Sequence, residues 1–300
     1  MSWNFELIVK PTAVPLTEGP VWDGEFLFFT HIHASRLLRY DPKSGAVTVV
    51  RENTNRTNGL AFDAQGRLFG CCSGGRSIVR FDADGSTAVV ADKFEGKRLN
   101  TPNDLAIDRK GRIWFTNPVN GGNWDKGSVS ELGDQSVYRL DPQADGSYKI
   151  ARVTFDTTMP NGILISPDNN TLYVAESSFE AKTPRELRAY PIKEDGSLGS
   201  FTTLHTWGAD SRGVHRGIDG MCLDRDGNIV ATNGWEVAGP GPLITVFSPT
   251  GRVLETHPVP ALRPTNCCFG GPDLTTLFVT VWHGHVFKAK TKRVGWAMYP

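Results

Sequence analysis

Several features that would point to other protein classes are missing from this chain. Its five cysteines form no Cys-x-x-Cys pair and no Cys/His spacing of the zinc-binding kind. No window approaches the roughly 20 apolar residues that a membrane-spanning helix needs. The opening MSWNFELIVKPTAV lacks the basic start and long apolar stretch of a signal peptide. We therefore expect a cytoplasmic protein with reduced, mostly buried thiols and no membrane partner.

An excess of charge of either sign is also absent. The 300 residues include 32 basic and 32 acidic side chains, and no run of like charges stands out. Phosphate binding needs a basic excess or patch, so nucleic acid is not the expected partner. No G-x-S-x-G segment and no Ser-His-Asp order are found, which argues against a serine hydrolase. No stretch shows sustained helical periodicity with caps.

A repeat is what the chain does contain. Six short apolar segments each begin with a residue that carries a side-chain oxygen, and four residues later each has a large apolar residue. The segments read EGPVW, NGLAF, NDLAI, NGILI, DGMCL and TNCCF, and they begin at Glu18, Asn58, Asn103, Asn161, Asp219 and Thr265. The intervals of 40, 45, 58, 58 and 46 residues lie near the period of propeller blades.

Each repeat continues in the same order. A polar turn such as Asp108-Arg109-Lys110-Gly111 follows the first strand, and a second apolar strand comes next. A third strand shows alternation, as in SRLLRYD and RSIVRFD, and the fourth is less regular. This pattern predicts an all-β, six-bladed β-propeller with four-stranded antiparallel blades, spanning residues 1–300 as one domain. The segment FELIVK (5–10) is expected to close the last blade as its outer strand, because an open array would leave unpaired edges.

The six opening residues would surround one mouth of the central channel. Asn-Gly and Asp-Gly dipeptides also open hairpins without any function, but that explanation suits Glu18 poorly. Two carboxylates, Glu18 and Asp219, would converge there with amides. Buried together they would repel, and a divalent cation would remove that cost. Oxygen ligands without His or Cys favour Ca²⁺ or Mg²⁺ over zinc.

A second set of side chains is expected at the same mouth, because the second strand of each blade runs back toward it. Long connections and linkers also reach this face, and loops gathered on one face usually mark the working face. Trp124 and Trp235 in these connections could form apolar walls or pack their own loops. The strand-end residues are His31, Cys72, Asn117, Glu176, Asn233 and Val281.

The chain resembles the senescence marker protein (regucalcin)/gluconolactonase family of calcium-dependent six-bladed propellers along essentially its whole length. The most specific segments are EGPVW (18–22), EGKRLNTPNDLAID (95–108), PNGILISPD (160–168) and IDGMCLDRDGNI (218–229). The resemblance implies that Glu18, Asn161 and Asp219 are the metal ligands and that Asp219 is the general acid/base. It also implies that Asn103 contacts metal-bound water or substrate at the same site.

Further substrate contacts follow from the same resemblance at Arg98 and Asn100. His31 and Asn117 stand where the family often has Asp, so together with Glu176 they are candidates for setting substrate preference. The stretch GVHRGIDG (213–220) is not a common form in the family. The expected partner is a small-molecule lactone, and the expected assembly is a monomer or weak homo-oligomer.

The predicted function is hydrolysis of a sugar lactone by a divalent-metal-dependent enzyme. Ca²⁺ is the expected ion, and Mg²⁺, Mn²⁺ or Zn²⁺ could replace it. Asp219 would act as base toward water, or it would attack the substrate directly. Two alternatives stay open: a related propeller phosphotriesterase or esterase, and a non-catalytic metal-binding scaffold, since propellers host many functions.

Overall fold

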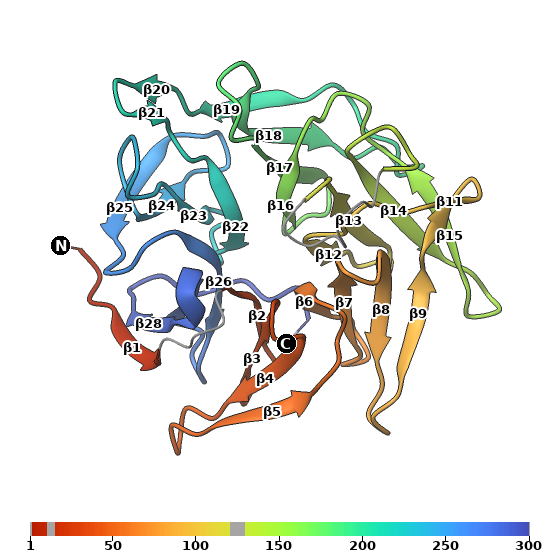
Figure 1. Ribbon diagram of the computed structural model, residues 1–300, viewed down its shortest axis with the longest axis horizontal. Helices are drawn as coiled ribbons and strands as arrows, with labels where there is room; N and C mark the ends of the chain where they lie inside the picture. The colour runs from red at the N-terminus through yellow and green to blue at the C-terminus, as the bar shows by residue number, and fades with distance from the viewer. Residues whose placement is uncertain (1, 11–15, 121–129, 300) are drawn as a thin grey trace.

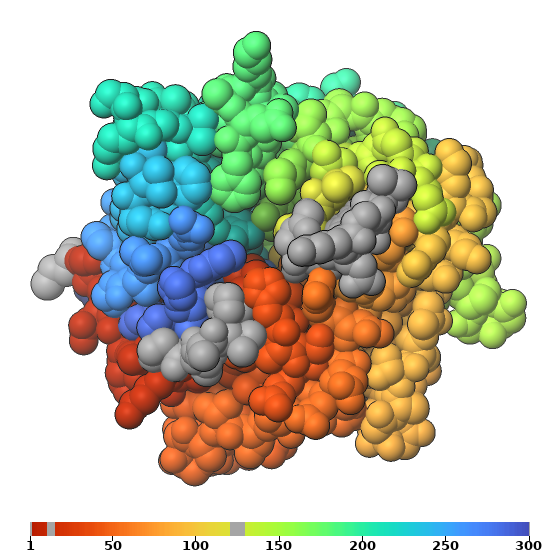
Figure 2. Space-filling view, in the orientation of Figure 1, coloured from red at the N-terminus to blue at the C-terminus, as the bar shows by residue number. Residues whose placement is uncertain are grey.

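Six four-stranded antiparallel sheets follow one another around a central axis in the computed structural model (Figure 1). The structure describes residues 2–10, 16–120 and 130–299; Trp124, which the sequence singled out, lies outside them. This arrangement confirms the predicted all-β, six-bladed propeller. In the space-filling view, the blades succeed each other from red to blue around the centre (Figure 2).

Each blade runs from an inner strand at the axis to an outer strand at the rim. Blades 1 to 3 comprise β2 (Thr17–Trp22), β3 (Leu27–His31), β4 (Arg36–Tyr40) and β5 (Val47–Arg51); β6 (Thr57–Phe62), β7 (Leu68–Cys72), β8 (Ser77–Phe81) and β9 (Thr87–Ala91); and β12 (Leu105–Ile107), β13 (Ile113–Asn117), β14 (Ser136–Pro142) and β15 (Tyr148–Arg152). Blades 4 and 5 comprise β16 (Pro160–Ile165), β17 (Thr171–Ser177), β18 (Arg185–Pro191) and β19 (Thr202–Thr206); and β22 (Ile218–Leu223), β23 (Ile229–Asn233), β24 (Leu243–Phe247) and β25 (Val253–Pro258).

The sixth blade joins the two ends of the chain. It contains β26 (Pro264–Gly270), β27 (Thr276–Val281) and β28 (Val286–Lys290), with the 3₁₀ turn η2 (Trp282–Gly284) between the last two. Its outer strand is β1 (Glu6–Val9), which pairs antiparallel with β28 through Leu7 and Phe287. The predicted closure by segment 5–10 is therefore confirmed.

Burial explains why the second strand of each blade is apolar on both faces. Every residue of β7, β13 and β23 is buried, because each blade is packed between two neighbours. By contrast, the first three residues of the outer strand β5 are exposed at the rim. The core therefore lies between adjacent blades, as where Phe69 of blade 2 packs with Phe115 of blade 3.

Acidic turns join the first and second strands. Asp108 accepts backbone hydrogen bonds from Lys110 (2.9 Å) and Arg112 (3.0 Å), and Gly111 takes the positive φ of 73° that the turn requires. The Asp-x-x-Gly segments predicted as hairpin turns therefore act as such at this end of the channel, opposite to the mouth where the inner strands begin.

Hydroxyl groups fix each blade against the next. Each of these serines and threonines donates to a backbone carbonyl at or next to the start of a neighbouring inner strand. The pairs are Thr30 to Asn58 (3.0 Å), Ser73 to Pro102 (2.7 Å), Thr116 to Asn161 (2.7 Å), Ser177 to Ile218, Thr232 to Thr265 (2.9 Å) and Thr265 to Thr17 (2.7 Å). The first residues of the inner strands are thus held in register around the axis.

We expect Thr116→Val to lower the free energy of unfolding by about 1–3 kcal/mol. Valine keeps the shape of threonine but leaves the Asn161 carbonyl and the Asp104 N–H, now 3.1 Å from the hydroxyl, without a partner. Urea unfolding followed by circular dichroism measures the change. Thr48→Val, on the exposed outer strand β5, is the control and should change stability by no more than about 0.5 kcal/mol. Equal stabilities for the two variants would contradict the role given to Thr116.

Two short hairpins and the C-terminal segment were not foreseen. The linkers into blades 3 and 5 form β10 (Lys93–Phe94) with β11 (Lys97–Arg98), and β20 (Ala209–Asp210) with β21 (Gly213–Val214). At the end of the axis where the turns lie, the backbone N–H of Trp296 donates to the Leu223 carbonyl (2.9 Å). The Tyr299 hydroxyl donates to the backbone carbonyl of Asp108. The final residues therefore connect several blades near the centre (Figure 1).

An apolar cavity of about 380 Å³ lies on the axis between these end residues and the inner strands. Trp296 and Tyr299 border it at one end, and Asp104 and Asn266 border it at the other. Within the described part of the chain, no helix has the length and apolarity that crossing a bilayer requires.

Candidate functional site

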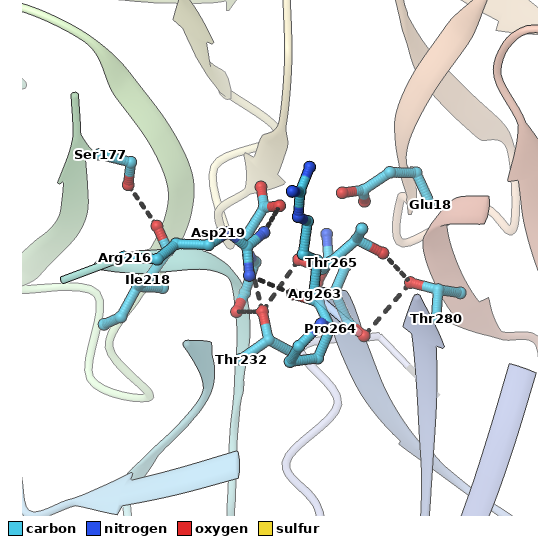
Figure 3. Close-up of polar contacts among 12 residues, drawn as sticks. Glu18, Ser177, Arg216, Ile218, Asp219, Thr232, Arg263, Pro264, Thr265 and Thr280 are labelled. Carbon is cyan, nitrogen blue, oxygen red and sulfur yellow. Dashed lines mark hydrogen bonds and ion pairs between the residues drawn. The ribbon is translucent and has the colours of Figure 1, made fainter. Parts of the chain in front are cut away.

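Buried and half-buried carboxylates meet at the mouth where the inner strands begin. Glu18 enters from blade 1 and is 5% exposed, while Asp219 enters from blade 5 (Figure 3). Both face the space at the axis. The Asp219 carboxylate accepts a hydrogen bond from the Asn161 amide of blade 4. The structure therefore brings together the three residues that the sequence predicted as metal ligands.

Arg216 is the cation of this cluster. Its guanidinium pairs with a carboxylate oxygen of Asp219 and also donates to the carbonyls of Pro264 (2.8 Å) and Gly234 (3.2 Å) (Figure 3). The sequence analysis gave Arg216 no role and named only the stretch that contains it, GVHRGIDG (213–220).

Asp104 is a site residue that the sequence analysis missed. It follows Asn103 directly, is 8% exposed, and lies 3.3 Å from the Asn266 amide of blade 6. The signal was present in the repeat: the position after the opening residue is Gly in four repeats but Asp104 and Asn266 in the other two. Those glycines provide space, since a Cβ at Gly59 would lie 2.4 Å from an Asp104 oxygen.

The electrostatics of the cluster favour a cation. Burial raises the pKa of Glu18 well above its usual value, and the charges of Asp219 and Asp104 raise it further. Burial likewise raises the pKa of Asp104 to about 7. The pKa of Asp219 is raised by burial, although the Arg216 charge and the Asn161 hydrogen bond oppose the shift. Fully ionised, the three carboxylates and Arg216 would leave a net charge of two negative units.

The donor set contains more than carboxylates. Within residues 2–10, 16–120 and 130–299, no three His, Cys, Asp or Glu side chains converge as a metal cluster. A cation at this mouth would therefore need an amide oxygen such as that of Asn161 beside Glu18 and Asp219. Hard cations such as Ca²⁺ accept this mixture of oxygen ligands.

Two strand-end residues present unsatisfied polar atoms. Asn117 is fully buried, and neither side-chain atom of its amide has a hydrogen-bond partner among the described residues. Glu176 uses one oxygen to accept bonds from Thr158 and Met159, while its other oxygen has no partner in the described part of the chain. Unpaired buried polar atoms are costly, so each is available to a ligand or water.

Asn103 and Asn100, two further predicted substrate contacts, are both buried. Asn103 is 7% exposed, and its backbone N–H donates to the Thr116 carbonyl (2.9 Å). Asn100 is buried; its amide N–H groups donate to the carbonyls of Asn117 and Asp134, and its amide oxygen accepts from the Ser130 hydroxyl.

Arg98 and His31 complete the predicted set. Arg98 is exposed on the β10–β11 hairpin and donates to the Gly75 carbonyl (3.0 Å). His31 is buried at the end of β3, where it pairs with Thr17 in the β2–β3 register. The substrate roles of all these residues stay predictions.

Removing Arg216 should destabilise the metal-free protein strongly. We expect Arg216→Met to cost about 3 kcal/mol of unfolding free energy in EDTA, because Asp219 would lose its buried partner. Arg212→Met breaks the exposed pair with Asp210 in the same linker, and it should cost no more than about 1 kcal/mol. Chemical denaturation of both variants beside the wild type measures the difference. A cost for Arg216→Met no greater than that for Arg212→Met would contradict this account.

Comparison with known proteins adds a consistent set of matches. Residues 16–283 match the family model described as the SMP-30/Gluconolactonase/LRE-like region. A gluconolactonase of Zymomonas mobilis is 30% identical over 306 residues, covering 96% of this chain and 82% of that protein. A diisopropyl-fluorophosphatase of Loligo vulgaris is 28% identical over 319 residues, covering 98% and 95%. A solved gluconolactonase structure from Xanthomonas campestris superimposes with a TM-score of 0.80 at 31% identity, covering 96% and 89%.

Proposed function

Because this chain belongs to the SMP-30/gluconolactonase/LRE-like family, we propose that it is a lactonase that opens a sugar lactone with the help of a divalent cation. One observation carries the proposal: carboxylates and amides from different blades converge at one end of the axis, around Glu18, Asn161 and Asp219. The gluconolactonase relatives from Zymomonas mobilis and Xanthomonas campestris supply the substrate class.

The residues present suit a divalent cation, most simply Ca²⁺. Glu18, Asp219 and the Asn161 amide would hold it. Burial and the charges of Asp219 and Asp104 raise the pKa of Glu18, and a bound cation would oppose that shift. Three protein ligands would leave positions for substrate and water. When bound, the cation would polarise the lactone carbonyl as a Lewis acid.

The chain's own groups would then carry the proton and orient the substrate. Asp219 would accept the proton of the attacking water and return it to the ring oxygen as the ring opens. Arg216 would keep the Asp219 carboxylate in one orientation. The Asn103 amide would donate to the oxygen that gains charge.

Asp219 could instead attack the carbonyl directly to form an anhydride with the substrate, and labelled water tests this route. In a single turnover in ¹⁸O water, ¹⁸O appearing in the Asp219 carboxylate would exclude a simple base role for Asp219. Label found in the product alone would exclude an anhydride that water opens at its Asp219 carbon. Peptide mass spectrometry reads both outcomes.

The proposal is tested by a screen of aldonolactones with metal present. We expect hydrolysis that stops in EDTA and returns with Ca²⁺, measured by acid release with a pH indicator. Lack of hydrolysis across all the lactones in the presence of Ca²⁺, Mg²⁺, Mn²⁺ and Zn²⁺ would overturn it. Fluorophosphate hydrolysis in the same screen would favour the second candidate, a phosphotriesterase, which the Loligo vulgaris relative brings forward.

A further inference from the structure

An aromatic and guanidinium cluster, which we call the rim stack, stands beside the candidate site. It consists of Phe179, Trp235, Arg263 and Trp282, from the connections of blades 4, 5 and 6. The rings of Phe179 and Trp235 have centroids 5.6 Å apart. The guanidinium carbon of Arg263 lies 5.5 Å from the indole ring of Trp235 and 5.5 Å from that of Trp282.

Arg216 ties the rim stack to the carboxylates. Its guanidinium bonds the carbonyls of Gly234 and Pro264, the chain neighbours of Trp235 and Arg263, while it pairs with Asp219. One side chain, that of Arg216, thus separates Asp219 from the backbone next to Trp235 and Arg263, and on this ground we place the rim stack at the border of the mouth.

Hydrogen bonds hold the rim stack in place. The indole N–H of Trp235 donates to the Val214 carbonyl (3.2 Å), and the backbone N–H of Trp282 donates to the Arg263 carbonyl (3.1 Å). Arg263 also forms a forked pair with one oxygen of Glu236, at 2.9 and 3.1 Å. A surface fixed in this way loses little conformational entropy when a ligand binds.

The chemistry of the rim stack suits a neutral ring with one apolar face and several hydroxyls. Glu236 balances the charge of Arg263, so an anion gains little there. Phe179 is 51% exposed and Val237 is 41% exposed, which leaves apolar surface open to a ligand. Glu236 and Arg263 remain partly exposed and can exchange hydrogen bonds with hydroxyl groups. The C–H face of a pyranose and its ring hydroxyls present these two kinds of surface together.

We propose that the rim stack is a subsite for a second sugar ring, so that the preferred substrate is the lactone of a disaccharide aldonic acid. This inference rests on the proposed lactonase function and names its substrate class. The lactone ring would lie among Glu18, Asn161 and Asp219, and the attached sugar would lie against Phe179 and Trp235.

Paired substrates test the subsite. We expect kcat/KM for cellobiono-1,5-lactone to exceed that for D-glucono-1,5-lactone by about tenfold, mainly through a lower KM. Phe179→Ala should bring this ratio close to one. Phe155→Ala is the matched control, because Phe155 is 74% exposed beside Arg152 in blade 3, and it should leave the ratio unchanged.

A binding measurement separates this inference from the proposed function. Titration with cellobionate, followed by calorimetry, should show binding that Phe179→Ala weakens, whether or not any lactone is opened. Binding without turnover would support the subsite and overturn the lactonase proposal. Equal kcat/KM for the two lactones with no cellobionate binding would overturn the subsite alone. A preference for the aryl lactone dihydrocoumarin over the disaccharide lactone would also overturn it, in favour of an aromatic substrate.

Discussion

Asp219→Asn is expected to lower kcat for lactone hydrolysis by about 10³-fold. The amide cannot accept the proton of the attacking water at neutral pH, and it cannot attack as a carboxylate would. Asparagine is nearly the same size, so the inner strand β22 should keep its place between Thr232 and the neighbouring blade. The measurement is steady-state hydrolysis of the best lactone from the screen, at saturating metal.

Its control is Asp226→Asn, an exposed turn residue of the same blade. This change should leave kcat within a factor of about two, since it touches none of the cluster. Circular dichroism spectra of both variants should overlay that of the wild type. If Asp219→Asn kept most of the wild-type kcat while remaining folded, Asp219 would be neither base nor nucleophile, and the mechanism would be wrong.

Glu18→Gln should weaken Ca²⁺ binding by about 100-fold or more, because it removes one of the two carboxylates available to the ion. Isothermal titration calorimetry measures the affinity. At a Ca²⁺ concentration 1,000 times the wild-type Kd, the stabilisation from binding should fall from about 4 to about 1.4 kcal/mol. In EDTA, by contrast, the variant should be at least as stable as the wild type, because Glu18 is buried close to two other carboxylates that repel it.

Glu18 is identified as a ligand if Glu18→Gln lowers stability in Ca²⁺ but does not lower it in EDTA. A residue that merely supported the fold would lower stability in both EDTA and Ca²⁺. Glu25→Gln, in the same blade, is the matched control, since its pair with Lys43 is exposed on both sides. Unchanged calorimetry for Glu18→Gln would place the ion elsewhere or favour the non-catalytic scaffold.

Much of the fold could be predicted because it depends on residues that are close together in the sequence. The Asp-x-x-Gly turns, the apolar second strands and the repeat interval each reflect short-range chemistry, and the closing strand 5–10 follows from the need to pair an edge. The C-terminal segment could not be predicted in this way, because its contacts, such as the bond from the Trp296 backbone N–H to the Leu223 carbonyl, join residues far apart in the chain. The two linker hairpins are local, as the pairing of Lys93 with Arg98 shows, but they belong to only two of the linkers and so leave no repeating signal.

Some residues of the candidate site could be predicted from the sequence and others could not, for the same reason. The positions of Glu18, Asn161 and Asp219 at one mouth followed from the repeat, because equivalent positions of a propeller return to equivalent places around the axis. Asp104 was missed because its neighbour Asn103 already occupied the expected position. The rim stack was foreseen only as a possible wall at Trp235, since its members come from three blades.

The sequence by itself determined six units, a closed ring and a set of oxygen-bearing side chains at its mouth, because each of these depends on residues close together in the chain. Tertiary structure alone decided which groups face each other across that mouth. The bond from Arg216 to the Pro264 carbonyl, the bond between Asp104 and Asn266, and the contact of Arg263 with two indole rings join different segments. Such pairs depend on how the blades are rotated about the axis, and no local pattern records that rotation.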